Sequence, residues 1–272
     1  MCPMNPPMIH GEPTHHTAGT LVQARVLFAL LMREMTTRFG RSSGGYLWAL
    51  IEPVGFIALL SLAFSQISHS PPIGRSFPLF YATGYIAFSF YNDIASLTGR
   101  AIQVNRPLLN YPAVTALDTV LARFLLQGLT GLAVAAVVFS GILAVFADQV
   151  RLQPVPLITA FALAGLLGLG VGLVNTTLFA LSKSWELAYG VISRPLFLVS
   201  GVFFTFESLP AAAREVLWWN PLIHLVGLMR AGFYPVYDGS HVSVLYLMAL
   251  GLGLVATGLV LMLACANRLA EQ

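Results

Sequence analysis

The sequence predicts an all-α membrane protein with six transmembrane helices, and three observations support this fold class. Of its 272 residues, 57% are hydrophobic and only 9% are charged, whereas a soluble domain carries roughly 25% charged residues. Six segments have about the 20 apolar residues that a membrane-spanning helix needs. Basic residues lie mainly on one side of these segments, as the positive-inside rule requires. With a formal net charge of +3, the chain is too weakly basic to predict a nucleic-acid partner.

The chain starts with a Pro- and His-rich stretch, residues 1–20. This stretch has neither the basic start nor the apolar centre of a signal peptide. We therefore predict a disordered cytoplasmic tail over residues 1–20, followed by one membrane domain over residues 21–272. A metal site built by His10, His15 and His16 is the less favoured alternative for the tail.

The segment Phe28–Arg41 predicts an amphipathic helix that lies in the membrane plane before the first span. At about 100° per residue, its apolar face is formed by Phe28, Leu31, Met32, Met35 and Phe39. Its polar face and the boundary of that face carry Arg33, Arg38 and Arg41. Helices of this kind lie in the membrane interface. A plain membrane anchor and a docking surface for a cytoplasmic partner both remain open for this helix.

The six predicted spans are Tyr46–Ser68, Phe77–Leu97, Thr119–Ala147, Pro156–Ser182, Leu187–Phe206 and Val242–Ala266. Because the third segment is long, we expect a cytoplasmic turn near Arg123. Of the 14 basic residues, nine lie on the side of the two chain ends, four lie on the opposite side, and Arg194 lies within the fifth span. The more basic side faces the cytoplasm, so both termini are predicted to be cytoplasmic.

The last outer connection, Glu207–His241, is long and rich in apolar and aromatic residues, which an ordinary loop does not need. It predicts short helices that re-enter the outer face of the membrane. Irregular backbone at that depth requires protein or a water-filled cavity around it. An interfacial aromatic belt is the alternative.

Three motifs in this chain resemble those of one known family. They are Arg33–Arg41 followed by Gly45–Pro53, then Ser193–Phe204, and then Trp219–His224. In this order and spacing, from about Arg25 onward, they resemble ABC-2-type polysaccharide export permeases. The Glu52-Pro53 pair resembles the capsular polysaccharide branch of that family.

The resemblance implies a homodimer of six-span subunits in the bacterial inner membrane, each paired with a separate ABC ATPase that binds ATP and Mg. In that family the amphipathic helix and the second connection contact the ATPase, the first and fifth spans line the glycan path, and short helices after the fifth span form an outer gate. Periplasmic and outer-membrane export components are further expected partners. The chain itself lacks the motif G-x-x-x-x-G-K-[ST], so we expect neither a cofactor nor enzymatic activity in it.

Eight residues are candidates for the glycan path. An Arg within a span must face a cavity or a partner, and aromatic rings give sugars an apolar wall along which they can slide. The eight candidates are Arg194, Glu52, Tyr46, Trp48, Phe56, Phe197, Phe203 and Phe204. Arg194 lies roughly 12 Å into the fifth span, and its guanidinium would donate to hydroxyls, carboxylates or phosphates. The alternatives are an ion pair of Arg194 with Glu52 or Asp93, and aromatic rings that face lipid or the protein core.

The other candidates lie at the two membrane faces. ATPase coupling is assigned to Arg33, Arg38, Arg41, Arg100, Arg106, Leu108, Leu109 and Tyr111. Between Arg106 and Leu108, we expect Pro107 to begin a short helix. A loop lying at the lipid headgroups is the alternative for this segment. The outer gate is assigned to Trp218, Trp219, Pro221 and His224.

Three functions compete, and an ATP-driven permease that exports capsular polysaccharide, or a related lipid-linked glycan, is favoured. An ion-coupled secondary transporter would need intramembrane carboxylates and often shows inverted repeats, and the sequence reveals no such repeat. A membrane-embedded glycan-processing enzyme would need convergent acid, base or metal groups. Against this, Glu52 and Asp93 fall on different predicted helices and no H-E-x-x-H motif occurs.

Overall fold

A computed structural model describes residues 15–39, 44–109, 114–146 and 150–265. Within these ranges the chain is helical, with short connections and no strand. The helices are α1 (His15–Phe39), α2 (Gly45–Ser65), α3 (Phe77–Gly99), α4 (Ala101–Leu109), α5 (Ala116–Phe146), α6 (Pro154–Leu181), α7 (Lys183–Leu198), the 3-10 turn η1 (Phe206–Ser208), α8 (Ala211–Leu217), α9 (Pro221–Phe233) and α10 (Val244–Ala264).

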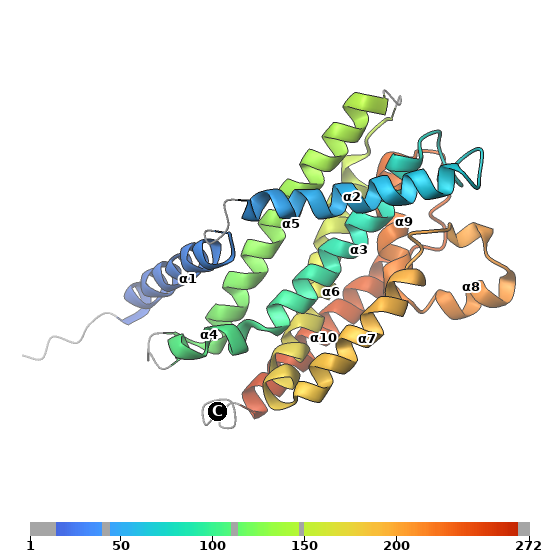
Figure 1. Cartoon of the computed structure of the whole chain (residues 1–272). Helices are drawn as coiled ribbons and strands as arrows, with labels where there is room; N and C mark the ends of the chain where they lie inside the picture. Colours follow the sequence, from blue (N-terminus) through green and yellow to red (C-terminus); the bar gives the residue numbers. More distant parts are fainter. Residues whose placement is uncertain (1–14, 40–43, 110–113, 147–149, 266–272) are drawn as a thin grey trace, which may run out of the picture.

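The long helices form one bundle with two distinct ends. In Figure 1, α3, α5, α6, α7 and α10 run side by side along the bundle. Helix α4, the turn between α6 and α7, and the last turn of α10 lie at one end, and α8 lies at the other. Helix α6 packs between α3 and α10, and α1 packs against α5.

Among the residues that the structure describes, four helices are long and apolar enough to cross a membrane: Leu47–Ser65, Ala116–Phe146, Pro154–Leu181 and Val244–Ala264. Helix α3 has 23 residues but is more polar than these four. Most of its side chains are buried, because α2, α5, α6 and α9 all pack around it. A helix enclosed by protein does not need a lipid-like surface.

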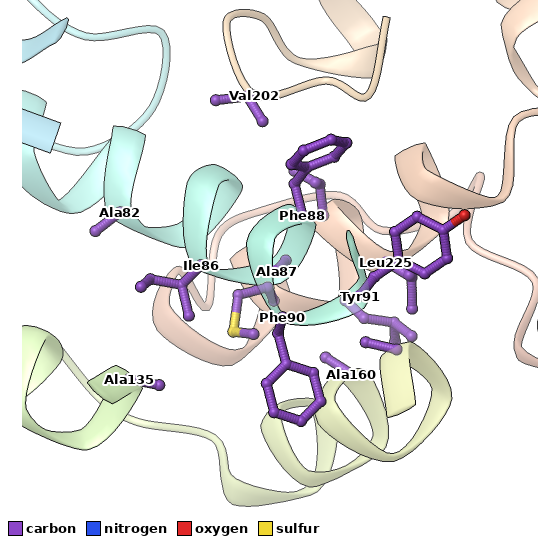
Figure 2. Packing of buried hydrophobic residues seen from close by; sticks show 14 of the residues in the cluster. Ala82, Ile86, Ala87, Phe88, Phe90, Tyr91, Ala135, Ala160, Val202 and Leu225 are labelled. Atoms are coloured by element: carbon purple, nitrogen blue, oxygen red, sulfur yellow. The ribbon is translucent and has the colours of Figure 1, made fainter. Parts of the chain in front are cut away.

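The main core forms around α3. Figure 2 shows Phe88, Phe90 and Tyr91 of α3 pointing toward neighbouring helices, with Ala160 of α6 and Leu225 of α9 close by. Small residues bring the α6 backbone against α3. A Cβ atom added to Gly168 would lie 2.8 Å from Ile94, and one added to Gly172 would lie 2.8 Å from Thr98. The glycines of α6 therefore serve close helix packing.

The predicted turn near Arg123 is wrong, because α5 runs unbroken from Ala116 to Phe146. Its start is fixed by a reciprocal cap: the Thr115 backbone N–H donates to Asp118 Oδ2 at 2.9 Å, and the Asp118 N–H donates to Thr115 Oγ1 at 3.2 Å. Such a cap satisfies the free N–H groups of the first turn. Arg123 therefore lies inside the helix.

Further boundaries differ from the prediction. Helix α1 begins at His15, within the stretch predicted to be a disordered tail and ahead of the helix start predicted at Phe28. The fifth predicted span extends to Phe206, but α7 ends at Leu198 and the chain then turns through Gly201, whose φ is +85°. That left-handed backbone suits glycine. Pro107 does not begin a helix: it lies in the last turn of α4, which starts at Ala101.

Candidate functional site

The structure brings three of the predicted path residues together in one aromatic cluster. Phe56 of α2 lies 5.6 Å from Phe197 of α7, and Phe197 lies 5.2 Å from Phe203, measured between ring centroids. Tyr85 and Phe88 of α3 complete the cluster, 4.7 Å from Phe56 and 4.9 Å from Phe197. These two rings were not predicted, because only the fold shows that α3 lies between α2 and α7.

The other predicted path residues lie outside this cluster. Trp48 is 66% exposed, Arg194 is exposed, and Phe204 is half-buried. Among the ion pairs formed by the described residues, none includes Arg194, so the alternative ion pair between Arg194 and Glu52 or Asp93 is not formed. The side chain of Tyr46 is outside the described residues.

A small polar cavity of about 120 Å³ lies between α2, α3 and α5. Glu52 and Asp93 both line it, together with Tyr85, Gln127 and Thr130. From the sequence, the two carboxylates were predicted to lie on different helices, with no site in common. The structure confirms the different helices but places both acids at the same cavity.

Three of the four predicted outer-gate residues form a second cluster of rings. The Trp218 ring centroid lies 5.3 Å from those of Trp219 and His224. His224 Nδ1 accepts from the Ser243 backbone N–H at 3.2 Å, so Nε2 carries the hydrogen and donates to the Trp218 carbonyl at 2.7 Å. Pro221 is the first residue of α9, where its missing N–H costs nothing.

Arg230, in the last turn of α9, was counted from the sequence only as an outer-loop charge. It is 1% exposed and donates to the carbonyl oxygens of Phe204 at 2.7 Å and Val202 at 3.2 Å. Its guanidinium carbon also lies 4.3 Å from the centre of the Phe80 ring. Because the chain between α7 and η1 is not helical, its carbonyls need a donor, and Arg230 supplies it. An Arg inside the apolar run Leu222–Phe233 was the available signal.

At the opposite end, Arg100 and Glu186 form an exposed ion pair of 2.7 Å that joins the end of α3 to the start of α7. Gln103 of α4 donates to the Phe179 carbonyl of α6 at 2.8 Å. Leu109 packs against a small cluster around Ile102, and Leu108 is half-buried while Arg106 is exposed. Helix α4 is therefore hydrogen-bonded to α6 and lies next to the Arg100–Glu186 ion pair.

Helix α1 is joined to α4 as well. Arg33 donates through Nη1 to Asn105 Oδ1 at 2.8 Å, and Asn105 Nδ2 donates to the Ala101 carbonyl at 3.1 Å. The predicted coupling residues Arg41 and Tyr111, and the side chain of Arg38, lie outside the described residues. Among the described residues, the predicted coupling set therefore lies on α1, on α4 and at Arg100, the residue between α3 and α4.

The sequence of this chain matches a known protein family. Residues 25–234 match the family model for the ABC-2 type transporter, which covers most of the chain. The chain belongs to the ABC-2 type transporter family. Membership confirms the resemblance found in the motifs, and it assigns this ABC-2 protein to membrane transport rather than to catalysis.

Named relatives agree over nearly the whole chain. The polysialic acid transport protein KpsM of Escherichia coli is 32% identical over 245 residues, which cover 90% of this chain and 95% of the relative. The capsule polysaccharide export inner-membrane protein BexB of Haemophilus influenzae is 28% identical over 256 residues, covering 93% and 96%. The corresponding protein CtrC of Neisseria meningitidis is 28% identical over 247 residues, covering 90% and 93%.

Proposed function

We propose that this ABC-2 protein is the membrane-spanning subunit of an ATP-driven exporter that moves capsular polysaccharide, or a related lipid-linked glycan, across the bacterial inner membrane. The match to KpsM over 90% of the chain carries this proposal, because that relative is named for polysialic acid transport. The aromatic cluster between α2 and α7 supports it physically, since ring faces suit the apolar C–H faces of sugars.

The proposed topology has six spans: α2, α3, α5, α6, α7 and α10, with α1 in the membrane plane and α8 and α9 at the outer face. Helix α4, the α6–α7 turn and the end of α10 share one end of the bundle. That end carries most of the basic residues, so it faces the cytoplasm together with both termini. Enclosure by neighbours explains why α3 spans despite its polar residues.

The proposed partners are an ABC ATPase, which supplies the ATP and Mg, and a second copy of this chain. The ATPase would dock on α1 and α4, and export components of the periplasm and outer membrane would complete the route. The proposed path residues are those of the aromatic cluster with Glu52, Trp48 and Arg194. The proposed outer gate consists of Trp218, Trp219, Pro221 and His224.

The test is deletion of the gene followed by localisation of the polymer. Export predicts that polysaccharide accumulates inside the deletion strain and returns to the surface when the wild-type gene is restored. Loss of all polymer would instead support a role in synthesis, as for a glycan-processing enzyme. Normal surface polymer in the deletion strain would overturn the proposal.

One observation favours the alternative of an ion-coupled transporter: Glu52 and Asp93 share a cavity among the spans. Intramembrane carboxylates of this kind often carry protons or cations. The two functions separate when the partner ATPase is inactivated while the proton gradient is kept. Export that stops supports ATP drive, and export that continues supports ion coupling.

A further inference from the structure

The cytoplasmic half of the bundle contains a buried ion pair that the coupling assignment did not include. Glu34 of α1 and Arg123 of α5 form an ion pair in which each side chain is only 10% exposed. Arg123 also donates through Nη1 to the Leu97 carbonyl of α3 at 3.0 Å. One guanidinium therefore joins α1, α3 and α5.

The position of Arg123 inside the bundle means that its charge needs partners there. Arg123 lies seven residues beyond the first residue of α5, which places it roughly 10 Å along that helix. A cation there is stable only when a carboxylate and hydrogen-bond acceptors surround it, and removal of one partner leaves the other charge buried and unpaired. Exposed pairs such as Arg100–Glu186 contribute far less.

Adjacent residues of α1 reach two different elements. Glu34 pairs with α5, whereas Arg33 donates to Asn105 of α4. Helix α1 is therefore fastened at one point both to the long apolar helix α5 and to the short helix α4. A push on α1 or α4 would move the ends of α3 and α5 with it.

We infer that Glu34 and Arg123 are positioning residues that fasten α1 to α3 and α5, so that movement of a docked ATPase reaches these two spans. The inference rests on the proposed function, because it assumes that the ATPase docks on α1 and α4. Glu34 and Arg123 act through the helices they hold and do not touch the transported polymer.

The test compares single and double neutral variants in the deletion strain. Glu34→Gln and Arg123→Met each leave one buried charge unpaired, so both should lower the amount of folded protein. The double variant removes both charges, and it should recover folding and still copurify the ATPase. Its surface polymer should nevertheless stay roughly tenfold below wild type, a change typical of lost coupling between sites. A merely stabilising role predicts that export recovers together with folding, which would overturn the inference.

Matched controls and a second readout keep the result clear. Glu215→Gln and Arg151→Met alter exposed charges and should leave export unchanged. Trypsin cleavage at the exposed Arg25 of α1, measured in inside-out vesicles, should rise in the pair variants because α1 is released. This cleavage does not depend on the polymer, so it still reports on the pair if the proposed function fails.

If the double variant does not accumulate, Glu34→Asp carries the test, since it keeps the charge but shortens the side chain. Raised cleavage of α1 with reduced export would support the inference. Raised cleavage with wild-type export would contradict it.

Discussion

Arg194 is a charged residue on the exposed side of α7, in a segment proposed to span the membrane. A lipid-facing Arg at that depth is costly, so we expect its guanidinium to face the transported polymer. Arg194→Ala should insert normally but lower surface polymer roughly tenfold or more, the loss of one charge-assisted hydrogen bond. Surface polymer is measured against the amount of protein in the membrane. Arg194→Lys should restore only part of export, because Lys lacks the planar fork.

The second prediction concerns Arg230, whose side chain binds backbone carbonyls rather than the transported polymer. Arg230→Met would leave the Val202 and Phe204 carbonyls without their buried donor. We expect a loss of roughly 2–5 kcal/mol in the free energy of unfolding, seen as a lower melting temperature of the detergent-purified protein. The exposed Arg151→Met serves as the control. An unchanged melting temperature for Arg230→Met would show that other donors satisfy this turn.

His241, in the outer connection before α10, predicts a dependence on pH. Burial, together with the nearby His224 and Arg230, lowers the pKa of His241 to about 4. Two carboxylates oppose this shift because they favour the protonated imidazole: Asp238 and Glu207, whose Oε1 lies 3.2 Å from His241 Nδ1. The unfolded chain takes up this proton below about pH 6.5, and the folded chain does so only near pH 4. The contribution of neutral His241 to stability is therefore complete above pH 6.5 and is lost as the pH falls toward 4.

Melting temperatures measured from pH 7.5 to pH 4.5 check this. The fall on acidification should be smaller in His241→Gln than in wild type. His69→Gln, which alters an exposed histidine of the α2–α3 connection, should behave like wild type. Equal falls in all three proteins would contradict the assignment to His241.

Single residues show how far sequence reasoning reaches: it nominates side chains, and the structure shows which of them lie together. Phe56, Phe197 and Phe203 were predicted from their spans, and the structure groups them. Trp218 and His224 were also predicted together. The partners Tyr85, Arg123 and Arg230 could not be assigned, because their roles depend on which helix packs beside them.

At the scale of elements, α4 is the short helix proposed to receive the ATPase. Leu109 was predicted to contact the ATPase, but Leu109 packs against the Ile102 cluster, so Leu109→Asp would disturb the fold as well as the docking surface. Val104 of α4 is 51% exposed and tests docking alone. Val104→Asp should reduce copurification of the ATPase roughly tenfold, because it places a charge in an apolar contact.

The control for α4 is Val236→Asp, since Val236 is 95% exposed in the connection between α9 and α10. It should leave copurification unchanged. If Val104→Asp also copurifies the ATPase as wild type does, α4 is not the docking surface, and α1 with Arg33 becomes the better candidate.

Element boundaries divide into those that hydropathy predicts and those that tertiary contacts decide. The long apolar helices α2, α5, α6 and α10 were found from composition, because lipid selects for it. The end of α7 at Leu198 was missed, since the chain leaves the helix where Gly201 turns and Arg230 binds the released carbonyls. The apolar sequence continues past Leu198, so hydropathy does not indicate that the helix ends there.

At the scale of the whole molecule, α7 presents a face that nothing in the described chain covers. Leu187, Val191, Arg194 and Leu198 recur at spacings of three and four residues and therefore share one side of the helix. Their apolar members are 73%, 67% and 58% exposed in chain order. Lipid would suit the three apolar side chains but not Arg194, so we expect a second copy of this chain to face this side across the polymer path.

A twofold dimer brings the same face of both subunits together, so one cysteine near the axis meets its own copy. With Cys2 and Cys265 replaced by Ser, Val191→Cys should form a disulfide-linked dimer under mild oxidation in native membranes. The control is Leu252→Cys on α10, where Leu252 is 55% exposed. This variant should remain monomeric because residue 252 faces lipid. Cross-linking by Leu252→Cys but not by Val191→Cys would move the dimer interface to α10 and remove α7 from the shared path.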